Sequence, residues 1–131
     1  MFWGAGPQEP DFSLERGRLR PGVPLVRARG RLDRATVHDL GRAVEWCMAT
    51  MPWAVVVDLT RVTELRAGAV PRLGALVERV RAEFVGLHFV TNGGAVDGVL
   101  TVAPAGKRII VHHSIAAAQQ ALTRDPGVTH G

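Results

Sequence analysis

Apolar positions follow two different periods along the chain, and the stretch 53–84 contains both. Residues 53–59 form an unbroken apolar run rich in β-branched residues, which is typical of a strand covered on both faces in a mainly parallel sheet. From Gly68 the apolar residues recur three or four positions apart, at Val70, Leu73, Val77, Val80 and Phe84. Charged residues occupy the opposite side, so this stripe predicts an amphipathic helix. With a connection over residues 60–66, the stretch forms one β–α unit.

The residues before this unit predict a hairpin and a helix. Residues 12–19 and 24–32 are expected to pair across the turn at Arg20, Pro21 and Gly22. A helix is expected to open at residues 33–36, with Thr36 as its N-cap, and to stop before Pro52. Its apolar stripe consists of Val37, Leu40, Val44, Cys47, Met48 and Met51.

Strands and helices alternate again after the central unit. Strands are expected at 87–91 and 109–113, a short helix around residues 96–100, and a final helix capped by Ser114. This order predicts an α/β fold: an N-terminal β-hairpin, then β–α units that form a mixed, mostly parallel β-sheet with amphipathic helices. The domain is expected over residues 12–124, with a flexible N-terminal tail at 1–11 and a C-terminal tail at 125–131.

Composition narrows the class of protein. The chain has 131 residues, of which 47% are apolar and 21% charged, as expected of a single globular domain. No window holds eighteen apolar residues and the first residues lack a signal-peptide pattern, so we expect no membrane insertion and a cytoplasmic location. Cys47 is the only cysteine, which excludes an internal disulfide.

The net charge of +4 is unevenly distributed. Residues 16–34 contain seven arginines and one aspartate. Six of these arginines form two rows of period two, which we expect to share one solvent face of the hairpin: Arg16, Arg18, Arg20, Arg27, Arg29 and Arg31. A solvated sheet face is favoured over an acidic protein partner. Nucleic acid is disfavoured because no aromatic residues are interleaved with the arginines.

Two aspartates are candidates for chemistry, but the sequence favours structural roles for both. Asp58 ends the central apolar run, where a carboxylate could bind a metal or act as an acid or base. The favoured role is to accept hydrogen bonds from the loop that contains Thr60 and Thr63. Asp33 could contact a partner, and a turn or cap role is favoured.

Metal and cofactor motifs are incomplete. His112 and His113 are adjacent on a predicted strand and point to opposite faces, while His38 and His88 have no acidic or thiol companions. Gly106-Lys107 lacks the other residues of a phosphate loop, and Asn92-Gly93-Gly94 favours a turn over a phosphate site. We therefore predict no metal, no cofactor, no catalytic residue and no enzyme.

Three segments together resemble the motifs of one domain family. Residues 30–36, followed by Asp39-Leu40, resemble that family's turn between the second strand and first helix. Residues 55–63 resemble its central strand, and residues 95–100 lie where it has a short helix. The family is the STAS domain, which includes the bacterial anti-sigma factor antagonists; the likeness covers residues 12–122 and implies the fold predicted above, together with a protein-binding role.

The sequence departs from the family at the phosphorylation motif. Members that switch by phosphorylation carry Asp-Ser-x-Gly just before the second helix, and the serine is the acceptor. Arg66 and Ala67 occupy the aspartate and serine positions here, and residues 64–72 contain no hydroxyl group. Thr60 and Thr63 are left as secondary acceptors. The resemblance places the partner-binding residues around the second-helix start and the preceding turn: Arg66, Ala67, Gly68, Arg72, Gly30 and Asp33.

The leading hypothesis is therefore a non-enzymatic signalling module that resembles a bacterial anti-sigma factor antagonist in transcription regulation. It would bind an anti-sigma factor kinase, or a related protein, without a phosphorylatable serine at the usual position. A STAS subunit of a transporter or another multiprotein assembly is one alternative, and a weak nucleic-acid-binding basic domain is another. A homodimer is compatible with the sequence.

Overall fold

A five-stranded mixed sheet organises the computed structural model, which describes residues 12–102 and 109–123. The strands lie side by side in chain order: β1 (Phe12–Arg20), β2 (Val23–Leu32), β3 (Ala54–Leu65), β4 (Gly86–Val90) and β5 (Ile110–His112). The first pair is antiparallel and the other three pairs are parallel. The predicted α/β class is therefore confirmed. The expected tails lie outside the described residues.

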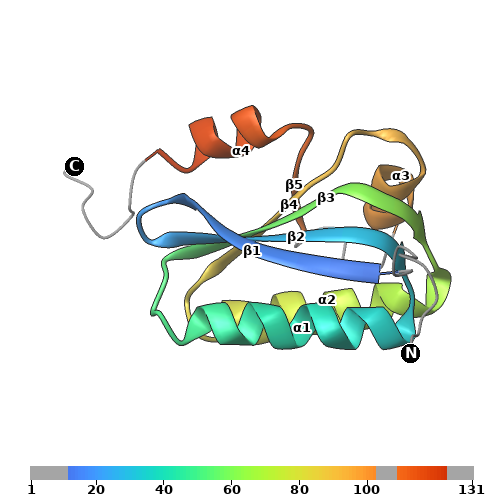
Figure 1. The fold of residues 1–131 in the computed structure, drawn as a ribbon, viewed down its shortest axis with the longest axis horizontal. Helices are drawn as coiled ribbons and strands as arrows, with labels where there is room; N and C mark the ends of the chain where they lie inside the picture. Colours follow the sequence, from blue (N-terminus) through green and yellow to red (C-terminus); the bar gives the residue numbers. More distant parts are fainter. Residues whose placement is uncertain (1–11, 103–108, 124–131) are drawn as a thin grey trace, which may run out of the picture.

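Helices cover the two faces of this sheet unequally, as Figure 1 shows. α1 (Arg34–Met48) and α2 (Val70–Arg81) lie together on one face, whereas α4 (Ile115–Ala121) lies on the other. α3 (Gly94–Val102) packs against β3, and a short 3₁₀ turn, η1 (Ala67–Ala69), leads into α2. Ser114 caps α4 as predicted, because its Oγ accepts a hydrogen bond from the Ala117 N–H at 3.0 Å.

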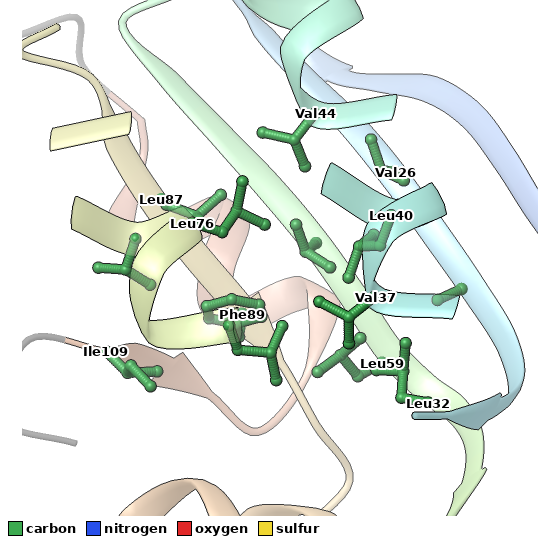
Figure 2. Close-up of a cluster of buried hydrophobic side chains, with 14 of the residues drawn as sticks. Val26, Leu32, Val37, Leu40, Val44, Leu59, Leu76, Leu87, Phe89 and Ile109 are labelled. Carbon is green, nitrogen blue, oxygen red and sulfur yellow. The ribbon is translucent and has the colours of Figure 1, made fainter. Parts of the chain in front are cut away.

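The larger core lies between the sheet and the pair α1 and α2. Figure 2 shows Val37, Leu40 and Val44 of α1 directed toward Val26 and Leu59 of the sheet. Leu76 of α2 lies with Leu87 and Phe89 of β4 in the same cluster. The buried part of each predicted stripe is confirmed, since Leu73, Val77 and Val80 are also buried.

A smaller core forms beneath α4 on the opposite face. The side chains that meet there are Val23, Leu25, Ala54, Val56, Val90, Ala118 and Leu122. β3 contributes to both cores, because side chains alternate along a strand: Val55 and Val57 face α1 and α2, and Val56 faces α4. The predicted burial of this strand on both faces is therefore confirmed.

β3 is longer than predicted. Residues 60–65, expected as a connection, continue the strand beside β2. The register shifts twice, between Arg27 and Arg29 and again between Gly30 and Arg31, and β3 carries one additional residue at each shift. These bulges place Leu59, Val62 and Leu65 in the same core at intervals of three, which hides the period of two expected of a strand.

The ends of the two long helices also differ from the prediction. Met51 and Phe84 were placed in the apolar stripes, yet they are 90% and 96% exposed. α1 ends at Met48 and α2 ends at Arg81. Three residues after each helix end, Met51 and Phe84 adopt left-handed backbone conformations, with φ of 55° and 62°. The chain leaves the helix before either side chain can face the core, so this prediction is wrong.

The helix cap of α1 is shifted by three residues from its expected place. Asp33, not Thr36, is the N-cap: its Oδ1 accepts hydrogen bonds from the N–H groups of Ala35 and Thr36 at 3.0 and 2.9 Å. The Thr36 hydroxyl in turn accepts a hydrogen bond from the Asp33 N–H at 2.7 Å, which completes a capping box. The cap role favoured for Asp33 is confirmed.

The arginine rows do not share one face of the hairpin. Arg16 pairs with Val26, whose side chain lies in the α1 core, whereas Arg27 pairs with Glu15 and contacts Asp58 on the other face. A register shift between Arg18 and Arg20 turns Arg20 toward α4, where its Nη1 donates to the carbonyl oxygen of Leu122 at 2.8 Å. The single basic face predicted from the sequence is wrong.

Two histidines meet between β4 and β5. The His88 and His112 rings are stacked with centroids 5.3 Å apart, and His88 Nδ1 lies 3.0 Å from His112 Nε2. Burial lowers the pKa of His88 to about 4, and burial also lowers the pKa of His112. Charge repulsion from a neighbouring histidine is the second cause that lowers the pKa of each ring.

The exposed, left-handed Phe84 leads to a first prediction. Phe84→Gly should raise the free energy of unfolding by about 1 kcal/mol, because the left-handed conformation costs a non-glycine residue about 1–2 kcal/mol. Phe89→Ala, at a fully buried position of β4, should lower it by about 3–5 kcal/mol. Urea denaturation measures both. A loss of stability in Phe84→Gly would mean that Phe84 packs in the core.

The histidine pair leads to a second prediction, on pH. An unfolded histidine has a pKa of about 6.5, so below that pH the unfolded chain binds protons that folded His88 refuses until about pH 4. The free energy of unfolding should therefore fall as the pH drops from 6.5 toward 4 and change little above that window. Urea midpoints across this range measure the effect. His88→Gln should flatten the slope and His38→Gln, at an exposed helix position, should not; equal slopes in all three proteins would reject this account.

Candidate functional site

The residues that the resemblance designates for partner binding come from two loops that lie side by side. One loop joins β2 to α1 and contains Asp33, and the other joins β3 to α2 and contains Arg66. β2 and β3 are parallel neighbours, so their carboxyl ends meet at the same edge of the sheet. The Arg66 N–H donates to the carbonyl oxygen of Leu32 at 2.9 Å and ties the loops together.

A hollow of about 530 Å³ lies between these loops. Its lining consists of Arg31, Asp33, Arg34, Ala35, Arg66 and Gly68. Three of the designated residues, Asp33, Arg66 and Gly68, are thus brought together. Ala67 lies exposed beside them, whereas Arg72 is exposed farther along α2 and does not line the hollow.

Two glycines allow the loops to take this form. Gly30 has a φ of 108°, a conformation that side-chain-bearing residues rarely adopt, just before the motif turn. At Gly68 a Cβ atom would lie 3.0 Å from Cγ of Arg34 and 3.3 Å from its Cδ. The aliphatic stem of Arg34 therefore lies over Gly68, and a larger residue there would displace it.

Arg31 and Arg34 are site residues that the sequence reasoning did not designate. Both flank Asp33 in the motif, and that position was the available signal. The sequence does not show where their side chains point. Arg34 extends to the loop before α2, and Arg31 Nε lies 3.6 Å from Asp33 Oδ2. The packing of α1 against η1 brings Arg34 to the hollow, whereas Arg31 reaches it from the end of β2.

The site carries a surplus of positive charge. Three arginines line the hollow, and the carboxylates close to them are Asp33 and Glu64, whose Oε2 lies 2.7 Å from Arg66 Nε. The N–H of Thr36 donates to Asp33 and holds its pKa below the usual value, so this carboxylate is charged at neutral pH. The Arg66 and Glu64 side chains are about half exposed, and such pairs hold each other weakly. The positive end of the α2 dipole adds to the surplus.

The position that matches the phosphoacceptor holds a methyl group. Ala67 is exposed in η1, directly after Arg66. The nearby hydroxyl residues lie in β3 instead of the helix start. Thr60 is half-buried, and its N–H donates to Asp58 Oδ1 at 2.9 Å; Thr63 is exposed.

Asp58 has the structural role that the sequence favoured. Its side chain is buried, it accepts the hydrogen bond from the Thr60 N–H, and its Oδ2 lies 3.6 Å from Arg27 Nε. Within residues 12–102 and 109–123, no three histidine, cysteine, aspartate or glutamate side chains converge as metal ligands would. The buried carboxylate is therefore satisfied by the protein itself.

The remaining candidates lie elsewhere in the fold. Asn92-Gly93-Gly94 forms the predicted turn, with φ of 82° and 80° at the glycines and the Asn92 amide donating to the Thr60 carbonyl. His113 diverges from His112 and lies 3.1 Å from Asp97. Burial raises the pKa of the Cys47 thiol, which makes it a poor nucleophile. Gly106-Lys107 lies outside the described residues.

Within residues 12–102 and 109–123, no helix is both long and apolar enough to cross a bilayer.

Comparison of the sequence with known families and with curated proteins finds no match. The structure does have counterparts. An anti-sigma factor antagonist from Mycobacterium paratuberculosis is 25% identical, with a TM-score of 0.76 over 88% of this chain and 98% of its own. The phosphorylated form of SpoIIAA, a Bacillus cell fate determinant, is 10% identical, with a TM-score of 0.61 over 83% of this chain and 99% of its own.

A third counterpart is a much larger protein. The murine anion transporter Slc26a9 is 18% identical, with a TM-score of 0.60 over 79% of this chain, which corresponds to only 18% of the transporter.

The resemblance to STAS domains carried by the sequence motifs is confirmed at the level of structure by the anti-sigma factor antagonists. This chain has the SpoIIAA-like α/β fold of the anti-sigma factor antagonists.

Proposed function

We propose that this protein is a non-enzymatic STAS-type module that binds a protein partner, an anti-sigma factor kinase or a related regulator, through the hollow around Arg66. The observation that carries the proposal is the convergence of Asp33, Arg66 and Gly68 from two loops onto one exposed, basic surface. The anti-sigma factor antagonist from Mycobacterium paratuberculosis, with the same fold, supports the class of partner.

The charge of the site indicates what the partner presents. Arg31, Arg34 and Arg66 face solvent around the hollow, next to the positive end of α2. A family member phosphorylated before its second helix would present a phosphate at this spot, which has the opposite sign. The partner of this protein therefore carries a patch with surplus carboxylates, and complementary charges of this kind act on both the encounter and the lifetime of a complex.

Binding of this kind is not controlled by phosphorylation at the family position. With Ala67 in place of the serine, the protein binds its partner whenever it is present. The amount of bound partner is therefore controlled by the abundance of this protein, or by a second STAS protein that does carry the serine. Cytoplasmic location follows from such a partner.

A transporter-associated STAS subunit is the second candidate, favoured by the fold shared with part of Slc26a9. Genes for transporter components beside this one would support it, and a neighbouring sigma factor or kinase gene would support the first. A nucleic-acid-binding role loses its main argument, because the arginine rows lie on different faces of the hairpin.

A third prediction concerns phosphorylation. Incubation with the cognate kinase and labelled ATP should leave residues 64–72 unmodified in mass spectrometry, because none of them has a hydroxyl group. A serine-containing antagonist treated with its own kinase is the positive control. Label on Thr60 or Thr63 would show that the phosphorylation site lies in β3. Label within residues 64–72 would overturn the proposed alignment.

A fourth prediction concerns the partner surface. A pull-down from the native cell, with mass spectrometry, identifies the partner for calorimetry with purified proteins. Arg66→Glu should weaken that complex by about 1–3 kcal/mol, mostly through faster dissociation, because the reversed charge faces a carboxylate in a desolvated contact. Arg81→Glu is the matched control, because Arg81 lies at the opposite end of α2 and is half-exposed like Arg66. This substitution should change the affinity for the partner little.

Two results would move the interface away from this site. One is an equal loss of affinity in Arg66→Glu and Arg81→Glu, which would indicate a non-specific charge effect. The other is unchanged affinity in Arg66→Glu. Circular dichroism and urea midpoints of both variants establish that each is folded before its affinity is interpreted.

A further inference from the structure

A second surface lies at the free edge of the sheet, away from the hollow. β1 is the first strand in the sheet order and pairs only with β2 among the described residues. Its outer edge therefore presents backbone N–H and C=O groups that no described strand satisfies. An edge strand of this kind is a template for a further strand.

A groove lies next to this strand on the α1 side of the sheet, between the β1–β2 hairpin and α1. It consists of two hollows, of about 820 and 320 Å³, and both are lined by Arg16 of β1 and Trp46 of α1. One extends along Arg18 and Thr50 to the hairpin turn, and the other extends toward Leu14 and Arg42. The groove therefore follows β1 from near its beginning to its end.

The middle of the groove has an aromatic side chain that the fold does not bury. Trp46 is 68% exposed, and the guanidinium carbon of Arg16 lies 5.0 Å from its ring centroid. This cation–π contact holds the ring beside the free edge of β1. Tryptophan and arginine are the residue types that most often dominate the energy of protein interfaces.

The charges along the groove select among possible occupants. Arg16, Arg18 and Arg42 line it, and Asp39 is the one acidic residue of the lining. Arg16 and Arg18 point to the α1 side of the sheet, as does Leu14, because β1 alternates. An added strand that places carboxylates at every second position would set them along this row of guanidinium groups.

The same charges disfavour a second copy of this chain. Antiparallel pairing of two β1 strands across a two-fold axis has three central registers. The first places Glu15 opposite Glu15, the second places Arg16 opposite Arg16, and the third places Arg16 opposite Arg18. Like charges directly opposite each other on neighbouring strands are destabilising, so none of the three is favourable.

We propose that this groove binds an acidic, extended segment of another protein, which adds to the sheet as a sixth strand beside β1. Its acidic side chains, at alternate positions, direct their carboxylates to Arg16, Arg18 and Arg42, and their methylene groups pack on Trp46. This surface is separate from the hollow around Arg66 and does not depend on the partner proposed there.

Calorimetric titration with a synthetic probe tests the proposal. The probe is a capped nine-residue peptide in which glutamate and valine alternate, and the control peptide has lysine in place of glutamate. The glutamate peptide should bind the full-length protein, and the lysine peptide should not. Arg16→Glu should weaken binding at least ten-fold, whereas Arg81→Glu, on the remote end of α2, should leave it unchanged. Absence of binding by the glutamate peptide at millimolar concentration would overturn the proposal.

Backbone pairing is tested separately from charge. Two further glutamate peptides carry N-methyl groups at odd or at even positions. A strand uses only alternate N–H groups toward its neighbour, so one of the two should lose binding and the other should keep it. Amide chemical shifts in residues 12–20 should change together with binding. Equal binding of both methylated peptides would reject strand addition.

Two controls identify a competing occupant. Sedimentation of the protein alone should show a monomer at concentrations where the probe binds; a dimer dissociated by Arg16→Glu would show that a second copy occupies the edge. Removal of residues 1–10 should leave the affinity for the probe unchanged. A large gain of affinity on removal would instead assign the groove to the chain's own N-terminal segment and overturn the proposal.

Discussion

Burial of β3 on both faces is the constraint on which the rest of the structure depends. Val55 and Val57 pack under α1 and α2, and Val56 packs under α4, so the strand joins both cores. A slip of one residue against β2 or β4 would exchange the two sets of side chains and disrupt both cores at once. The parallel register on either side of β3 is therefore strongly fixed, and the positions of the neighbouring strands follow from it.

The basic hollow around Arg66 is a consequence of this register. Once β2 and β3 are aligned, their carboxyl ends deliver two loops to the same edge, and the hydrogen bond from Arg66 to Leu32 holds them together. The capping box at Asp33 fixes where α1 begins, which places Arg34 over Gly68. The basic hollow thus lies on a rigid support, although the arginines that line it are largely in solvent.

The uneven covering of the sheet explains why charged groups collect where they do. α1 and α2 cover one face along its length, whereas α4 covers only part of the other. On that second face the half-exposed Arg27 pairs with the buried Asp58. At the outer edge, β1 has no described neighbour beyond it, so Arg16 turns to the exposed ring of Trp46. Contact with solvent and pairing between charged groups, more than packing in the core, account for these positions.

The sequence by itself determined the elements whose pattern is local. The stripe of Val37, Leu40 and Val44 and the apolar run of β3 could be predicted because the burial of a helix or strand face depends on spacing between near neighbours. The motif positions of Asp33, Arg66 and Ala67 were also available, as a resemblance. Tertiary structure alone decided the rest. The β1–β2 register placed the arginine rows on different faces, and bulges beside β2 hid the strand period in the second half of β3. Left-handed backbone conformations turned Met51 and Phe84 outward, and the β4–β5 register brought His88 beside His112. Arg34 reached the site only through packing of α1 on η1. These features arise from pairing and packing between residues far apart in the chain, which no local period encodes.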